Sequence, residues 1–463
     1  MCQKAEDPLV LPVRCAPKKA PCPRCGKPAR RKRTLRRRVR TIAYQRVAWL
    51  DIRYGEYAAR CGCCKSFRTS PDGVLPKAAY DNRVRQAVLD RILQDGLNVE
   101  RTRAALARDF LLELSTGFVY DCLRWQVAQL DLAPHRQAVL AQFSGTLCVD
   151  ELHLGAYTLL LATDPVADLP VAFALVGKND QGHLRRFLRG LKEWGLSPRV
   201  VVTDGSNLYP AVLAELWPFA YHQLCVFHLL RDLNELVLQA VRRLRRGLAR
   251  RGNAGRKRRR GRRSARRGGP TAKEKAAFVF RHRHLLVKRT EALSRPEWDD
   301  LGRLFAYLPE LRLLWRFACD ARELFAPGQA VQWAWRRRAA LLREAAYQRA
   351  PELVQAMAML SEDKFTRAVA FVHSPAGQQV RTNNHVERAN RRLRFAEKVR
   401  YKWRRRRWVV RYLVLALDRW WRQAAKAKAK AAAPSAAASP KKTCAAGGAQ
   451  ESGPATRRST AAG

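Results

Sequence analysis

The chain has few acidic residues and no long uninterrupted apolar run. Its 463 residues include 39 Asp and Glu against 90 Lys and Arg, a formal net charge of +51. A compact domain with this charge repels itself unless a polyanion neutralises it, so we expect a nucleic acid partner rather than the role of a ribosome-associated or membrane-surface protein. The missing apolar signal segment and membrane-length run predict a cytoplasmic protein with no membrane partner.

Cysteines in a cytoplasmic protein are reduced, so clustered ones favour metal binding over disulfides. Two pairs near the start have the C-x2-C spacing of a zinc ribbon: Cys22 with Cys25, and Cys61 with Cys64. Cys63 is expected to be the spare thiol, with competition for the place of Cys61 or Cys64 as one alternative and coincidental cysteines as the other. Residues 41–60 alternate as in a hairpin. The basic run at 30–40 is expected to follow DNA phosphates.

Helical periodicity replaces this pattern between residues 81 and 132. A short helix, a turn and a helix predict a helix-turn-helix, whose recognition helix at 116–127 starts with Thr116 as N-cap. Tyr120, Arg124 and Gln126 would then be available for DNA. The alternative is a helical linker that packs on the next domain.

Three separated segments each place one carboxylate where a metal could be held. Asp150 and Asp204 each end an apolar β-type run, and Glu387 opens a helix. The elements between residues 145 and 204 follow a ribonuclease-H-like order, in which the first and fourth strands are neighbours, so Asp150 and Asp204 should meet at one edge of the sheet. Glu151 should point to the opposite face and is the reserve candidate. Taken singly, Asp204 could be a turn residue and Asp150 a surface acid.

Two further motifs lie near these acids in our interpretation. Cys225 and His228 have C-x2-H spacing, which is weak evidence for zinc, and His228 would contact the scissile phosphate or be a buried core histidine. Glu387, Arg391 and Arg394 share one helix face. This face would place cations that bind phosphates next to a carboxylate that binds a metal. A surface ion-pair ladder is the alternative there.

The chain is 47% hydrophobic, enough to form two to four folded units. Four tryptophans in its helical insertion are expected to pack in the core more than to stack on bases. We expect a multidomain protein with these segments: an N-terminal arm at 1–20, a zinc ribbon at 21–75, a helix-turn-helix domain at 78–140, the first part of an α/β ribonuclease-H-like core at 144–235, an all-α insertion at 236–376 with a mobile basic tract at 242–267, the last part of the core at 377–422, and a disordered tail at 423–463.

Taken in order, these motifs resemble the bacterial insertion-sequence DDE transposases of the ISL group over residues 20 to 422. They are also similar to Mutator-like transposases, which share the C-x2-H motif and the helical insertion. The resemblance implies that Asp150, Asp204 and Glu387 bind two Mg²⁺ ions, with Arg394 matching a basic residue two turns after the catalytic Glu. Where the group more often has an acid, this chain has Cys225, whose role is open.

The resemblance implies a DNA transposase that binds the terminal inverted repeats of its element and catalyses metal-dependent strand cleavage and transfer. Its partners would be the double-stranded DNA of the element ends and of the target, bound by a homo-oligomer at the bacterial nucleoid. A zinc ion would be structural. The alternatives are a non-catalytic or domesticated DNA-binding protein and a ribonuclease-H-like nuclease.

Overall fold

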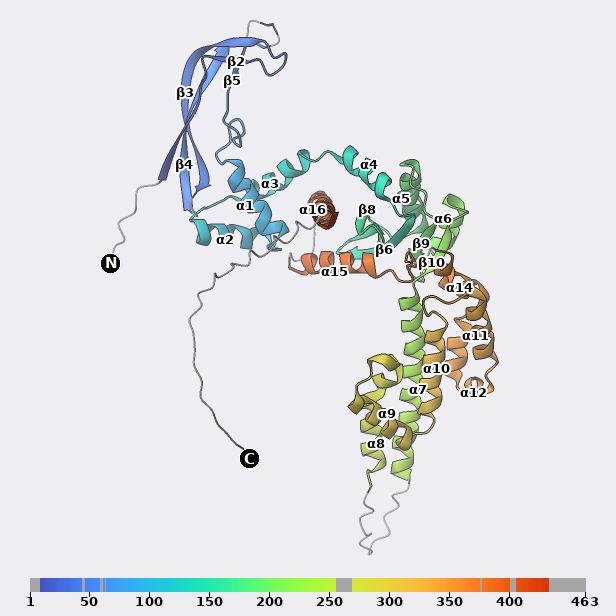
Figure 1. Cartoon of the computed structure of the whole chain (residues 1–463). Coiled ribbons are helices and arrows are strands. Elements are labelled where there is room, and N and C mark those ends of the chain that lie inside the picture. Colours follow the sequence, from blue (N-terminus) through green and yellow to red (C-terminus); the bar gives the residue numbers. More distant parts are fainter. Residues whose placement is uncertain are drawn as a thin grey trace, which may run out of the picture.

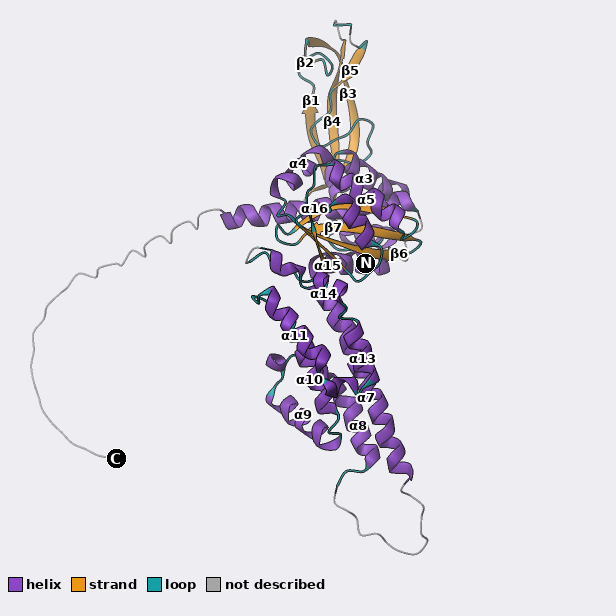
Figure 2. Ribbon diagram, turned by 90° about the vertical axis from the view of Figure 1, so that its right-hand side faces the viewer, coloured by secondary structure: helices purple, strands orange, loops and turns teal. Residues whose placement is uncertain are grey.

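The computed structural model describes residues 9–43, 46–58, 61–62, 64–254, 269–374, 377–399 and 405–432. Figures 1 and 2 show a small β-sheet at one end of the molecule, a long group of helices at the other, and a second sheet wrapped by helices between them. The charged site described below lies in this central part. Within the described residues, no helix combines the length and the apolar character needed to cross a membrane.

The first sheet is built on a long antiparallel hairpin, β3 (Pro28–Ala43) with β4 (Arg46–Ala58). The strand order is β1-β4-β3-β2, and β5 (Ser66–Arg68) also pairs with β4. Residues 9–21 are therefore not a separate arm: β1 (Leu9–Cys15) runs parallel to β4, and β2 (Lys19–Pro21) pairs with β3. The basic run at 30–40 lies on β3.

Three helices with side-chain caps follow this sheet: α1 (Asn82–Leu93), α2 (Val99–Phe110) and α3 (Thr116–Ala128). They pack around one apolar cluster. The cap of α3 is Ser115, whose side chain accepts from Phe118 N at 3.1 Å, and not Thr116 as predicted. Thr116 is the first helical residue, because only the residue outside the helix can turn its hydroxyl onto the free N–H groups. Helix α4 (Leu132–Gln142) then leads to the second sheet.

The second sheet has the strand order β10-β9-β6-β7-β8. Its strands and first two helices are β6 (Thr146–Leu154), β7 (Tyr157–Asp164), β8 (Leu169–Val176), α5 (Gln181–Glu193), β9 (Val200–Thr203), α6 (Tyr209–Leu216) and β10 (Tyr221–Leu224). β6 pairs antiparallel with β7 and parallel with β9. The prediction that the first and fourth strands are neighbours is thus confirmed.

Apolar side chains cover both faces of this sheet. Leu147 and Val149 of β6 pack with α5 and α6 on one face. Cys148 and Leu152 pack on the other face with α15 (Asn384–Val399) and α16 (Arg406–Ala432). Successive residues of β6 therefore face different helices, as the pleat of a strand requires.

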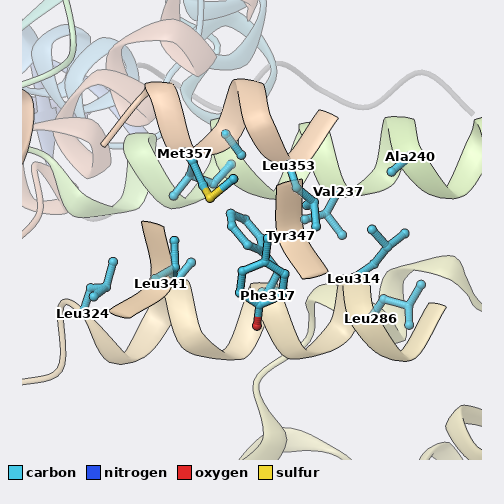
Figure 3. Packing of buried hydrophobic residues seen from close by; sticks show 14 of the residues in the cluster. Val237, Ala240, Leu286, Leu314, Phe317, Leu324, Leu341, Tyr347, Leu353 and Met357 are labelled. Carbon is cyan, nitrogen blue, oxygen red and sulfur yellow. The ribbon is translucent and has the colours of Figure 1, made fainter. Parts of the chain in front are cut away.

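The insertion between β10 and α15 is helical. It starts with the long α7 (Val226–Ala254) and contains α8 (Ala272–His282), α9 (Arg295–Tyr307), α10 (Leu311–Glu323), α11 (Val331–Arg343), α12 (Ala345–Gln348), α13 (Pro351–Ala358), α14 (Glu362–Ala368) and the 3₁₀ turns η1 (Arg283–Val287), η2 (Thr290–Ala292) and η3 (Ala370–His373). Figure 3 shows its core, where Phe317 and Tyr347 lie among aliphatic side chains of α7, α10 and α13.

The tryptophans of the insertion divide between its core and its surface. Trp315 and Trp335 pack against the core cluster, whereas Trp298 and Trp333 are exposed. Core packing is therefore confirmed for two of the four. Of the basic tract at 242–267, residues 242–254 belong to α7 and residues 255–267 lie outside the described part of the chain.

The last helix joins the central sheet to the three-helix cluster. α16 contacts both β8 and α3, and Trp408 stacks on Tyr120 with ring centroids 4.2 Å apart. It continues to Ala432, so the tail does not begin at 423 as predicted, because Trp421 and Ala424 pack against Ala167 and Leu169. Residues 433–463 lie outside the described residues.

Candidate active site

Three carboxylates meet where β9 ends beside β6. Ligand oxygens of Asp150, Glu151 and Asp204 all lie within 4.8 Å of one another. β9 pairs with β6 only from Thr146 to Cys148, so the chain of β9 turns away just before Asp150. Asp204 follows directly after β9 and therefore lies next to the free edge of β6. The predicted meeting of Asp150 and Asp204 is confirmed.

Glu151 belongs to this cluster although it faces the other side of the sheet. Asp150 turns toward α15, where Asn390 Nδ2 donates to its Oδ2 at 2.7 Å. Glu151 lies on the α6 side, beside the buried Tyr209. The prediction that the two side chains point to opposite faces is correct, and the reserve candidate Glu151 lies in the cluster itself. At the uncovered edge of β6, a long side chain from either face can reach Asp204.

Two of the crowded carboxylates, Asp150 and Glu151, resist ionisation. Burial, with the charge of Glu151 added, raises the pKa of Asp150 to about 7. Burial and then Asp204 also raise the pKa of Glu151. Like charges in a partly dry site favour protonation unless a cation compensates them.

Several buried polar atoms around the cluster have no hydrogen-bond partner among the described residues: Glu151 Oε1, Glu387 Oε1, Asn390 Oδ1 and His228 Nδ1. Unpartnered buried oxygens are unfavourable and indicate a missing ligand. Carboxylate and carboxamide oxygens are ligands that hard divalent cations prefer. The residues present therefore fit a divalent metal ion.

Glu387 lies in an adjoining cluster rather than among the three carboxylates. Its ligand atoms group with those of Cys225 and His228 within 4.8 Å, and Glu387 Oε1 is 3.6 Å from His228 Nε2. The same helix reaches the first cluster, because Asn390 is one turn further along α15 and binds Asp150. Glu387 thus stands beside the Asp150 cluster on the α7 side.

Cys225 fixes the relative position of the two clusters. Its N donates to Thr203 O at 2.8 Å, next to Asp204, and its Sγ accepts from Asn383 N at 3.3 Å at the start of α15. Asn383 Nδ2 in turn donates to Val149 O at 3.0 Å, next to Asp150. The middle of β6, the end of β9 and the starts of α7 and α15 are therefore tied at one point, which gives Cys225 a structural role.

Of the remaining residues predicted to assist or to bind DNA, two lie on α15 near the site and two lie on α3. Arg391 is exposed and lies 3.9 Å from Glu387, and Arg394 is exposed on the same helix. Tyr120 is occupied by its stacking on Trp408, and Arg124 pairs with Asp121 at 2.8 Å. Sequence reasoning missed Asn390, although its position three residues after Glu387 places it on the same helix face.

The four predicted zinc ligands come together at the tip of the first sheet. Cys22, Cys25 and Cys61 group within 4.8 Å, and Cys64 Sγ is 3.9 Å from Cys22 Sγ. The backbone N–H groups of Arg24 and Cys25 lower the pKa of Cys22 to about 6, which favours the thiolate that zinc requires. The spare residue, Cys63, lies outside the described residues.

Comparison with known protein families gives a match. A sequence model of the ISL3-type DDE transposases, described as a transposase family, matches residues 147–401. No curated protein matches the chain at a significant level. The match covers more than half of the chain and includes both acidic clusters. The family implies a divalent metal ion, which the orphaned oxygens fit. The chain therefore belongs to the ISL3-type DDE transposase family.

Proposed function

We propose that the protein binds the terminal inverted repeats of its own insertion sequence and catalyses metal-dependent DNA strand cleavage and strand transfer. Asp150, Asp204 and Glu387 are its catalytic carboxylates and hold two Mg²⁺ ions. The observation that carries the proposal is the cluster of Asp150, Glu151 and Asp204 where β9 ends beside the middle of β6, with orphaned oxygens around it. The sheet is of the ribonuclease-H-like type.

The protein residues would orient the reaction. Bound divalent ions supply activation of the attacking oxygen and stabilisation of the leaving oxygen. Asn390 holds Asp150 through its amide, and His228 lies against Glu387 on the other side. Arg391 and Arg394 attract the phosphates next to the scissile bond, because α15 carries them on its exposed surface.

DNA recognition would be shared among the N-terminal units. The Cys22, Cys25, Cys61 and Cys64 cluster holds a structural Zn²⁺ ion, and α2 with α3 forms a helix-turn-helix. Exposed basic residues of β3 line the hairpin, and Arg124 of α3 is exposed. The protein acts in the cytoplasm on nucleoid DNA, as a homo-oligomer that holds both element ends and the target.

Incubation of the full-length protein with its own element-end DNA and Mg²⁺ tests the proposal. We expect cuts at the inverted repeats followed by joining, and Asp204→Asn should abolish both while binding persists. Asp299→Asn, an exposed acid on α9, is the matched control and should cut normally. Specific binding without cutting by any of the three proteins would instead indicate a DNA-binding regulator, and cutting without joining would indicate a nuclease.

A further inference from the structure

Phe395 is an exposed aromatic side chain on the helix that carries Glu387. The residue is 68% exposed. The buried side of α15 is formed by other residues, among them Val386, Ala389 and Leu393, and Phe395 joins none of the apolar clusters of the described residues. Its exposed neighbours on the helix are Arg391, Arg392, Arg394 and Lys398. Core packing therefore does not explain a phenylalanine at this position.

The position of Phe395 relative to Glu387 is set by the helix. Eight residues separate them, which is about 12 Å along the axis at 1.5 Å per residue. Arg391 lies between them and is 3.9 Å from Glu387. A DNA strand with its scissile phosphate at the carboxylates would place a neighbouring phosphate near Arg391 and a base within a few nucleotides of the cut near Phe395.

We propose that Phe395 is a binding site for an unpaired nucleobase next to the cleavage point. This inference rests on the proposed function, since it assumes that DNA lies at the carboxylates. A bare aromatic ring stacks on any base, and flanking arginines hold the backbone on either side. The same arginines would repel a second copy of this basic chain, so charge favours DNA as the occupant of this surface.

Phe219 provides a matched control elsewhere on the molecule. It is 96% exposed and lies between α6 and β10, near the end of β10 where Tyr221 pairs with Val200. Asp204 follows the opposite end of β9. Phe219 is therefore more accessible to solvent than Phe395 but remote from the carboxylates.

The test measures binding of the full-length Asp204→Asn protein to two versions of the element-end DNA, one fully paired and one with unpaired bases beside the cut. We expect Phe395→Ala to weaken binding of the unpaired version by about 5- to 150-fold, the effect of losing one stacked base. Binding of the paired version should change little, Phe395→Trp should restore the loss, and Phe219→Ala should bind like the parent. The unpaired base is replaced by 2-aminopurine, whose fluorescence should differ between the parent and Phe395→Ala.

Equal affinity of the parent and Phe395→Ala for the unpaired DNA, or a change in oligomeric mass instead of affinity, would overturn the proposal. Circular dichroism checks folding, and Phe395→Leu keeps an apolar side chain while removing the ring. A selective loss of binding, together with a wild-type protein that never cuts the same DNA in Mg²⁺, would support the base site while contradicting the transposase activity. No binding of either DNA would contradict both.

Discussion

The ionised carboxylate of Asp150 destabilises the folded protein when no metal ion is bound. Its pKa is raised from 3.8 to about 7, so the folded state holds a proton that the unfolded state releases. The folded state is therefore destabilised progressively as pH rises from about 4 to about 7. A bound cation would reverse this effect, because it favours the charged form.

Asp150→Asn should consequently raise the melting temperature of the metal-free protein at pH 8 by several degrees, with little difference near pH 4. Thermal unfolding in EDTA across this pH range measures the difference. Added Mg²⁺ should stabilise the wild type more than the variant. A variant that melts below the wild type at pH 8 in EDTA would show that Asp150 is not held under unfavourable charge.

Glu151 gives a second prediction at this scale, because its carboxylate is in the cluster and one of its oxygens is orphaned. We expect Glu151→Gln to weaken Mn²⁺ binding by about 10- to 100-fold, as loss of a supporting group at a metal site does. Isothermal titration calorimetry measures this, with Glu193→Gln at the exposed end of α5 as control. Unchanged affinity would leave Glu151 outside the metal site.

At the scale of elements, the site depends on two helices that start at one point. The starts of α7 and α15 stand at the two ends of the insertion, yet Val226 N donates to Arg381 O at 2.9 Å and Cys225 Sγ accepts from Asn383 N. Loss of the sulfur would free the start of α15 and with it Glu387. The joint therefore couples the insertion to the geometry of the carboxylates.

Cys225→Ala should lower the free energy of unfolding by about 1 to 3 kcal/mol, through a small cavity and one unpaired buried N–H. Hydrogen exchange should accelerate at the amides of Asn383 and the first turn of α15. Cys225→Ser keeps an acceptor and should exchange closer to the wild type, and Cys319→Ala in α10 is the control for loss of a thiol. Equal exchange in all variants would contradict the role of the joint.

The apolar patterns of the sequence and the expected strand order were enough to predict part of the fold and of the candidate site. Asp150 and Asp204 were predicted as neighbours because each follows an apolar strand and the strand order of the sheet sets which ends meet. Glu151 was predicted only as the reserve candidate, because periodicity gives the face of a side chain but not its reach. Two features could not be predicted from the sequence. The parallel pairing of β1 with β4 is non-local, and the contact between Asn390 and Asp150 depends on how α15 packs on the sheet.

The net charge of +51 has a consequence for the molecule as a whole. Binding that releases counterions from six to ten phosphates should weaken by about 10³- to 10⁵-fold between 50 and 200 mM salt. A double variant of exposed β3 residues, Lys32→Gln with Arg38→Gln, should reduce the slope of log affinity against log salt by about 2. Arg36→Gln should change it less, because Arg36 already pairs with Asp51 at 2.6 Å. Fluorescence anisotropy across a salt series measures the slopes, and identical slopes would remove β3 from the DNA interface.

The order of elements along the chain has a consequence during synthesis. The chain of the ribbon and of helices α1 to α3 ends at residue 128, although α16 later adds Leu415 to their apolar cluster, whereas Glu387 follows the entire insertion. A translation product that stops within the insertion would contain all the N-terminal units proposed to recognise the element ends but would lack α15. Such a fragment would occupy the ends without cutting them, so incomplete copies of the protein should act as competitors that restrain the element they came from.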